Sequence, residues 1–190
     1  MSGASGAGAV LLFPGAGSGR EHPALVAIER VLAPLPVVRA DFPYRREGRK
    51  SPDRPAKLIA CVRDEAAALA DAAGVGPVAV VLGGRSMGGR MCSMAVAEGL
   101  PAAGLVLIAY PLHPPGRADK LRIDHFPDIT VPCLFVSGTR DPFATPDELE
   151  ARAAAITGAV TNVWIEGGRH ELKGAERPVA EAVSAWVGRL

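Results

Sequence analysis

Short apolar runs and longer amphipathic stretches alternate along this chain. Six runs rich in Val, Ile and Leu predict buried strands near residues 9–13, 36–41, 77–82, 104–109, 132–136 and 160–165. Between them, apolar residues at helical spacing predict helices near residues 22–33, 55–73, 87–98, 146–156 and 175–188. Such alternation is typical of parallel sheets, so we expect an α/β fold with a doubly wound, mainly parallel, six-stranded sheet.

Length, charge and cysteine content narrow the class of protein. The 190 residues fit a single domain over 1–190, and a net charge of +1 predicts no general affinity for nucleic acid or membranes. The three cysteines are odd in number and lack C-x-x-C spacing, which indicates neither a disulfide framework nor a metal site. Residues 1–8 lack the basic region and long apolar run of a targeting segment. We therefore expect a reduced, cytoplasmic protein.

A glycine-rich turn follows the strand near 77–82. The apolar run is expected to break at Gly83, and a helical pattern begins after Ser86, which stands at the centre of a G-x-S-x-G pattern. Small flanking residues suit a sharp turn from strand to helix, which would expose the serine Oγ beside the free N–H of Met87. In this position the pattern indicates a nucleophilic serine.

Two further polar residues each follow a later strand. Asp141 comes just after the strand near 132–136, and His170 lies in a glycine-rich loop after the strand near 160–165. With Ser86 they have the chain order of a catalytic triad at one end of a sheet, in which His170 takes the serine proton and Asp141 orients the imidazole. The irregular segment after the fourth strand holds three rival acids, Asp119, Asp124 and Asp128.

A serine nucleophile also needs two N–H donors for the oxyanion of the transition state. Met87 is expected to supply one. The loop after the first strand, residues 14–19, is expected to supply the other, with Ala16 preferred and Gly17 next. Many esterases carry His-Gly at the start of this loop, whereas this chain has Pro14, so the loop must be anchored differently.

Five segments together resemble the α/β-hydrolase superfamily. They are Phe13-Pro-Gly-Ala-Gly17, Asp41-Phe-Pro-Tyr44, Gly83-Gly-Arg-Ser-Met-Gly-Gly-Arg90, Gly138-Thr-Arg-Asp-Pro142 and Gly168-Arg-His170. They are most similar to a small, lidless branch that includes dienelactone-hydrolase-like proteins and the hydrolase-like family of testis-expressed and NSL-complex subunit proteins. The resemblance implies a minimal hydrolase core without the leading antiparallel hairpin. Dienelactone hydrolases use a cysteine at the elbow, where this chain has Ser86, so their substrate is not implied.

Two irregular segments adjoin the expected site. Residues 111–130 occupy the place of a lid in larger relatives but are too few for a cap domain, so we expect an open nucleophile. Residues 45–54 hold the densest basic run, which is either a solvated loop or a substrate contact. An arginine also precedes each triad residue, at Arg85, Arg140 and Arg169, and one facing the pocket would favour an anionic substrate. Arg85 and Tyr44 are the candidate substrate-binding residues.

These residues predict a serine hydrolase of small-molecule esters or thioesters that forms a covalent acyl-enzyme and needs no metal or organic cofactor. One alternative is a binding or scaffold protein that keeps hydrolase geometry without turnover. A second is a dinucleotide-binding oxidoreductase, because residues 15–20 are glycine-rich and Asp41 ends the next strand. The third glycine of that fingerprint, however, would fall on Arg20, and the fingerprint leaves Ser86 and His170 unexplained.

Overall fold

Six parallel strands form the centre of the computed structural model, which describes residues 6–190. The strands are β1 (Ala9–Phe13), β2 (Val37–Arg39), β3 (Val80–Arg85), β4 (Gly104–Ile108), β5 (Cys133–Gly138) and β6 (Val160–Ile165). Their order across the sheet is β2-β1-β3-β4-β5-β6, and every pairing between them is parallel. The predicted six-stranded α/β sheet is confirmed.

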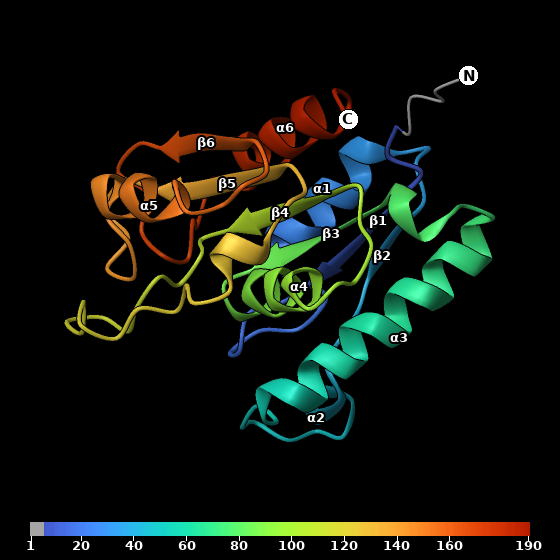
Figure 1. Cartoon of the computed structure of the whole chain (residues 1–190), viewed down its shortest axis with the longest axis horizontal. Coiled ribbons are helices and arrows are strands. Elements are labelled where there is room, and N and C mark those ends of the chain that lie inside the picture. Colours follow the sequence, from blue (N-terminus) through green and yellow to red (C-terminus); the bar gives the residue numbers. More distant parts are fainter. Residues whose placement is uncertain (1–5) are drawn as a thin grey trace.

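Helices cover both faces of this sheet (Figure 1). On one face lie α1 (Pro23–Leu32) and α6 (Glu176–Val187), and on the other lie α3 (Pro55–Ala73), α4 (Met87–Ala97) and α5 (Pro146–Ala153). A further short helix, α2 (Pro43–Arg46), extends into the start of the basic stretch 45–54, where no helix was predicted. No helix within residues 6–190 is both long and apolar enough to cross a membrane. The expectation about a targeting segment falls partly on residues 1–5, which lie outside the described residues.

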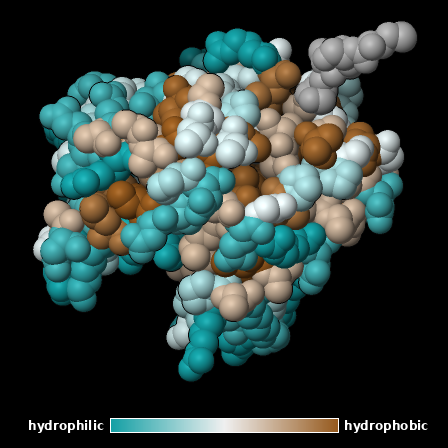
Figure 2. All heavy atoms as spheres, in the orientation of Figure 1, coloured by the Kyte–Doolittle hydropathy of each residue, from teal (hydrophilic) through white to brown (hydrophobic). Residues whose placement is uncertain are grey.

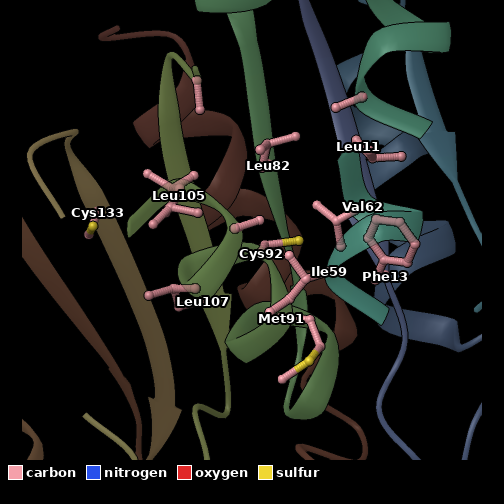
Figure 3. Packing of buried hydrophobic residues seen from close by; sticks show 14 of the residues in the cluster. Leu11, Phe13, Ile59, Val62, Leu82, Met91, Cys92, Leu105, Leu107 and Cys133 are labelled. Atoms are coloured by element: carbon pink, nitrogen blue, oxygen red, sulfur yellow. The ribbon is translucent and has the colours of Figure 1, made fainter. Parts of the chain in front are cut away.

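Alternate residues of each inner strand supply the two halves of the core. In β1, Val10 and Leu12 face α1 and α6, whereas Leu11 and Phe13 face the opposite side. Figure 3 shows Leu11 and Phe13 beside Val62 of α3, with residues of α4 packed on the neighbouring strands. Because both faces are covered, the inner strands are buried at every position and mostly apolar, which is why they stood out in the sequence.

Both ends of β3 differ from the prediction. The run near 77–82 begins with a turn of 3₁₀ helix, Pro77–Ala79, and the strand then continues to Arg85 instead of breaking at Gly83. A Cβ at Gly83 would collide with the carbonyl of Val106 in β4, and one at Gly84 would collide with the carbonyl of Phe13 in β1. These glycines permit close strand packing rather than ending the strand, so the elbow lies at Ser86 itself.

The carboxyl ends of the strands lie together at the left and lower edge of Figure 1, where the loops after β1 and β4 project. In the same orientation, Figure 2 shows the molecular surface indented between the lobe at the left and the lower lobe that holds α2 and α3. The segment 111–130 belongs partly to the core, since Leu112, Phe126 and Ile129 are buried. Residues 115–120 are exposed and belong to a projecting loop, and within the described part of the chain no cap domain covers this edge.

Candidate active site

Ser86 lies at the junction between β3 and α4 in a strained conformation. Its φ of 51° and ψ of −116° are rarely adopted by residues other than glycine, at a cost of about 1–3 kcal/mol. The N–H of Ser86 donates to the carbonyl oxygen of Ile108 at 2.7 Å, which fixes the turn to the neighbouring strand. Gly84 and Gly88 are both required here, because a Cβ at either would collide with the carbonyl of Phe13.

The loop after β5 brings an aspartate, and the loop after β6 brings a histidine, to this serine. Ser86 Oγ lies 2.9 Å from Nε2 of His170. The other ring nitrogen, Nδ1, lies 2.8 Å from Oδ2 and 3.1 Å from Oδ1 of Asp141. The loops after β5 and β6 can meet because Gly138 and Gly168 pack backbone to backbone, and the N–H of Arg140 donates to Gly168 at 2.9 Å. The three residues predicted as a triad are therefore adjacent.

The carboxylate of Asp141 is enclosed by its surroundings. The residue is only 2% exposed, and its Oδ1 accepts a hydrogen bond of 2.8 Å from the N–H of Phe143. The ring of Phe143 stacks on the imidazole of His170 with centroids 3.9 Å apart. The imidazole is therefore positioned by Phe143 on its face and by the Asp141 carboxylate at its edge. The rival acids are exposed and make no hydrogen bond to His170: Asp119, Asp124 and Asp128.

Backbone donors for an oxyanion lie beside the serine. Met87 is the first residue of α4, so its N–H has no acceptor within the helix. Ala16 and Gly17, in the loop after β1, line the same cavity as Ser86 and Met87. This arrangement is compatible with the predicted pair of donors, with either loop residue as the second.

Tyr44 lies beneath this loop rather than in the cavity. Its hydroxyl donates to the carbonyl oxygen of Ala16 at 2.9 Å, and its ring is buried against Phe42. Burial raises the pKa of Tyr44, so the hydroxyl keeps the proton that it donates. Tyr44 was expected to contact the substrate, but in the structure its hydroxyl positions the loop at Ala16 instead. This hydrogen bond anchors a loop that begins with Pro14 rather than with His-Gly.

The cavity in front of Ser86 has a volume of about 510 Å³. Four loops and the start of α4 enclose it. It is lined by Ala16, Gly17, Ser18, Arg85, Ser86, Met87, Arg90, Pro111, Arg122, Phe143, His170 and Glu171. Within residues 6–190, no cluster of three or more His, Cys, Asp or Glu side chains is arranged to hold a metal ion.

The cationic side chains singled out from the sequence are mostly engaged elsewhere. Arg85 is 4% exposed, and its guanidinium donates to the carbonyl of His170 at 3.0 Å and to the Glu171 carboxylate at 2.7 Å. Arg140 is exposed outside the cavity, and Arg169 lines a separate hollow on the far side of His170. None of residues 45–54 lines the cavity. Several are ion-paired instead: Arg46 with Glu65, and Arg49 with Glu47 and Asp53.

Two cationic residues of the cavity were not predicted from the sequence. Arg90 lies one helical turn after Ser86 on α4, and Arg122 reaches the cavity from the segment after β4. The position of Arg90 could have been deduced from the elbow, because residues four apart share one face of a helix. Nothing in the sequence places Arg122 there, since it lies in an irregular segment.

The dinucleotide-like pattern has a different explanation in the structure. Oδ1 of Asp41 accepts a hydrogen bond of 2.8 Å from the backbone N–H of Arg20, so this carboxylate fastens the glycine-rich loop to the end of β2. The helix that follows begins with its own cap, since Nδ1 of His22 accepts from the N–H of Ala24 at 3.3 Å. The Asp41 carboxylate and the N-terminus of α1, the two groups that would hold a nucleotide, thus each make a hydrogen bond within the chain.

The chain matches a known family model and is similar in fold to solved structures. A family model described as an alpha/beta hydrolase domain matches residues 6–186. The fold is similar to that of a dienelactone hydrolase from Anabaena variabilis, with a TM-score of 0.76, 22% identity, and coverage of 95% of this chain and 85% of that one. It is also similar to Est1E from Butyrivibrio proteoclasticus, with a TM-score of 0.71, 17% identity, and coverage of 96% and 87% respectively. At such identities these structures establish the likeness of fold alone.

Proposed function

Because the chain belongs to the family described as the alpha/beta hydrolase domain, we propose that it is a serine hydrolase of small-molecule carboxylic esters or thioesters. The observation that carries this proposal is the contact of 2.9 Å between Ser86 Oγ and His170 Nε2, made by a serine on a strained elbow. The carboxylate of Asp141 on the opposite ring nitrogen completes the hydrogen-bond chain that a serine needs for activation.

In the acylation step, Ser86 Oγ attacks the carbonyl carbon of the substrate while His170 Nε2 accepts the hydroxyl proton. Asp141 keeps the other imidazole proton on Nδ1 and stabilises the imidazolium that forms. The oxyanion of the tetrahedral intermediate accepts hydrogen bonds from the N–H of Met87 and from the loop at Ala16 or Gly17. When the intermediate collapses, the alcohol or thiol leaves with the proton from His170, and the acyl group remains esterified to Ser86.

In the deacylation step, water takes the place of the serine hydroxyl. His170 Nε2 accepts a proton from the water as its oxygen attacks the acyl carbonyl, and the same two donors bind the second oxyanion. Collapse returns the proton to Ser86 Oγ and releases a carboxylic acid. The open cavity in front of Ser86 gives this water access.

Three finer assignments belong to the same proposal. The five matching segments support placement in the small, lidless branch with the dienelactone-hydrolase-like and NSL-complex subunit proteins. A small aromatic acid as one product is consistent with a related fold, because a structure of Est1E holds ferulic acid. A reducing, cytoplasmic setting is supported by three buried cysteines that are all free thiols: Cys61, Cys92 and Cys133.

The proposal is tested by measuring hydrolysis of 4-nitrophenyl acetate and a matched acetyl thioester by the purified protein. Ser86→Ala should lower kcat/KM by about three orders of magnitude or more without changing the melting temperature, because only binding and the oxyanion donors remain. Ser184→Ala, on α6 and away from the cavity, serves as the matched control and should retain activity.

Two results would contradict the proposal. Wild-type activity in Ser86→Ala would show that another group is the nucleophile. An absence of ester and thioester turnover in the wild-type protein, together with no reaction of Ser86 with a fluorophosphonate, would favour the scaffold alternative.

A further inference from the structure

Arg90 and Arg122 bring two positive charges to the cavity of Ser86 from separate elements. Arg90 projects from α4, and Arg122 comes from the loop between β4 and η2 (Phe126–Asp128). Both residues are half-buried. Within residues 6–190, neither forms an ion pair with a carboxylate, in contrast to Arg85, whose charge is matched by Glu171.

The backbones that carry these arginines are held firmly. The carbonyl oxygen of Arg122 accepts a hydrogen bond of 2.9 Å from the hydroxyl of Tyr110, whose side chain is buried. The carbonyl oxygen of Arg90 accepts one of 2.8 Å from Ser93, which also lies 2.8 Å from Nε2 of His125. The guanidinium groups are not held in this way, since the buried Nε of Arg90 has no hydrogen-bond partner among the described residues.

The electrostatic surroundings leave this pair of charges uncompensated. Burial and the positive charge of Arg90 lower the pKa of Arg122. The same two causes lower the pKa of His125 to about 4, despite the opposing effect of Asp124, Asp128 and Glu98, so the imidazole is neutral near pH 7 and adds no charge. Two guanidinium groups that line one cavity without a counter-ion repel each other, and a bound anion would relieve that repulsion.

We infer that Arg90 and Arg122 form an anion subsite, so that the preferred substrates carry a carboxylate or phosphate group in addition to the scissile ester or thioester. The substrate part of this inference rests on the proposed hydrolase function. Planar guanidinium groups suit both anions, because each can present parallel N–H donors to two oxygens. The subsite lies within the same cavity as Ser86, so one small molecule can reach both.

The inference is tested with matched pairs of anionic and neutral esters. In the acyl pair, mono-4-nitrophenyl glutarate is compared with 4-nitrophenyl pentanoate. In the leaving-group pairs, the butyrate esters of 4-hydroxybenzoate and of 4-hydroxyphenyl phosphate are each compared with that of 4-hydroxybenzamide. The quantity measured is the ratio of kcat/KM for the anionic ester to that for its neutral partner.

For the wild-type protein we expect this ratio to exceed one in at least one pair. Arg90→Gln and Arg122→Gln should each lower it about tenfold, the size expected for losing one charge-assisted hydrogen bond. Arg122→Glu should lower it further. Arg177→Gln, which removes a charge that is 86% exposed on α6, is the control and should leave the ratio unchanged.

Two outcomes would overturn the subsite: a wild-type preference for neutral esters in every pair, or a ratio that neither Arg90→Gln nor Arg122→Gln alters. Calorimetry measures the binding of glutarate and of inorganic phosphate to Ser86→Ala. Because this binding needs no hydrolysis, it tests the anion subsite separately from the proposed hydrolase activity. Binding that is lost in Ser86→Ala/Arg90→Gln supports the subsite even if no ester is hydrolysed. When no ester is hydrolysed, an absence of anion binding contradicts the subsite.

Discussion

A single buried carboxylate, that of Asp141, determines which imidazole nitrogen of His170 carries a proton. Because Nδ1 donates to this carboxylate at 2.8 Å, Nε2 is left free to accept a hydrogen bond from Ser86 Oγ. Replacing the carboxylate with an amide of nearly the same shape would leave the packing intact but offer an N–H to Nδ1, which favours the wrong tautomer.

We therefore expect Asp141→Asn to lower kcat for ester hydrolysis by about 10³- to 10⁴-fold with little change in the melting temperature. Asp119→Asn and Asp128→Asn, which alter two of the rival acids, are the matched controls and should remain close to wild type. Steady-state kinetics of the three variants decide the assignment, which would be wrong if a control lost activity and Asp141→Asn did not.

The sequence predicted the positions of some site residues but not of others. Ser86, Asp141 and His170 could be predicted to lie together, because each follows a strand and parallel strands end at one edge of a sheet. The hydrogen-bond partners of Tyr44 and Arg85 could not be predicted, since their side chains turn toward Ala16 and Glu171, and that direction depends on neighbours distant in the chain. Arg122 was missed for the same reason. Arg85 nevertheless lines the cavity, so its expected contact with substrate stays a prediction.

At the scale of elements, the junction between β3 and α4 requires glycine where α4 passes β1. A Cβ at Gly88 would collide with the carbonyl oxygens of Phe13 and Pro14, which are backbone atoms that cannot rotate away. We expect Gly88→Ala to lower the free energy of unfolding by about 2 kcal/mol or more, and the melting temperature by roughly 5 °C or more. Urea and thermal unfolding measure both quantities.

Gly76→Ala is the matched control for this substitution. Its nearest neighbour would be a side-chain atom of Val78 at 3.9 Å, an ordinary contact, so its stability should stay near that of the wild type. Equal effects of the two substitutions would contradict the claim that close packing at the junction requires Gly88.

A second junction, between α4 and the loop before η2, depends on a histidine that is neutral near pH 7. His125 Nε2 lies 2.8 Å from Ser93 Oγ, and burial together with the charge of Arg90 lowers the pKa of His125 to about 4. The unfolded chain takes up this proton near pH 6.5, whereas the folded chain does not until about pH 4. The free energy of unfolding should therefore fall as the pH is lowered through this window.

His125→Gln keeps a hydrogen-bonding group beside Ser93 but cannot titrate. Urea unfolding at pH 7.5 and at pH 4.5 should show that the wild type loses more stability than the variant on acidification. If both lost the same amount, His125 would contribute nothing to the pH dependence of folding.

The elements themselves could be predicted where the chain is buried and less well at the edges. The four inner strands and the long helices α3 and α4 follow directly from apolar patterning. The edge strand β2 has only three paired residues of the six expected, and α2 is a single turn within a polar run. The sequence therefore located β2 but overestimated its length, and α2 has too short an apolar pattern to be recognised.

For the whole molecule, the open edge of the sheet predicts how the rate depends on the substrate's acyl chain. Among residues 6–190 no cap covers the cavity, so the rate should rise smoothly with soluble substrate and show no jump at an oil–water interface. Each buried methylene stabilises binding by about 0.8 kcal/mol at most, and an open cavity of about 510 Å³ buries few of them. Short acyl groups such as acetyl and butyryl should therefore be preferred.

Values of kcat/KM for 4-nitrophenyl esters from acetyl to palmitoyl measure this preference directly. A steep rise toward palmitoyl, or activation above the solubility limit, would mean that residues 111–130 act as a lid. The position of Leu112 and Phe126 in the core argues against such a movement, because opening would expose buried apolar surface.

Whether Ser86 is an activated nucleophile can be measured by covalent labelling. The purified protein is incubated with a fluorophosphonate, and the modified residue is located by mass spectrometry of its peptides. One adduct, on Ser86, should form within minutes in the wild type and much more slowly in His170→Ala, because no imidazole is then present to accept the serine proton. An unmodified Ser86, an adduct on another residue, or equal labelling of His170→Ala would contradict this assignment.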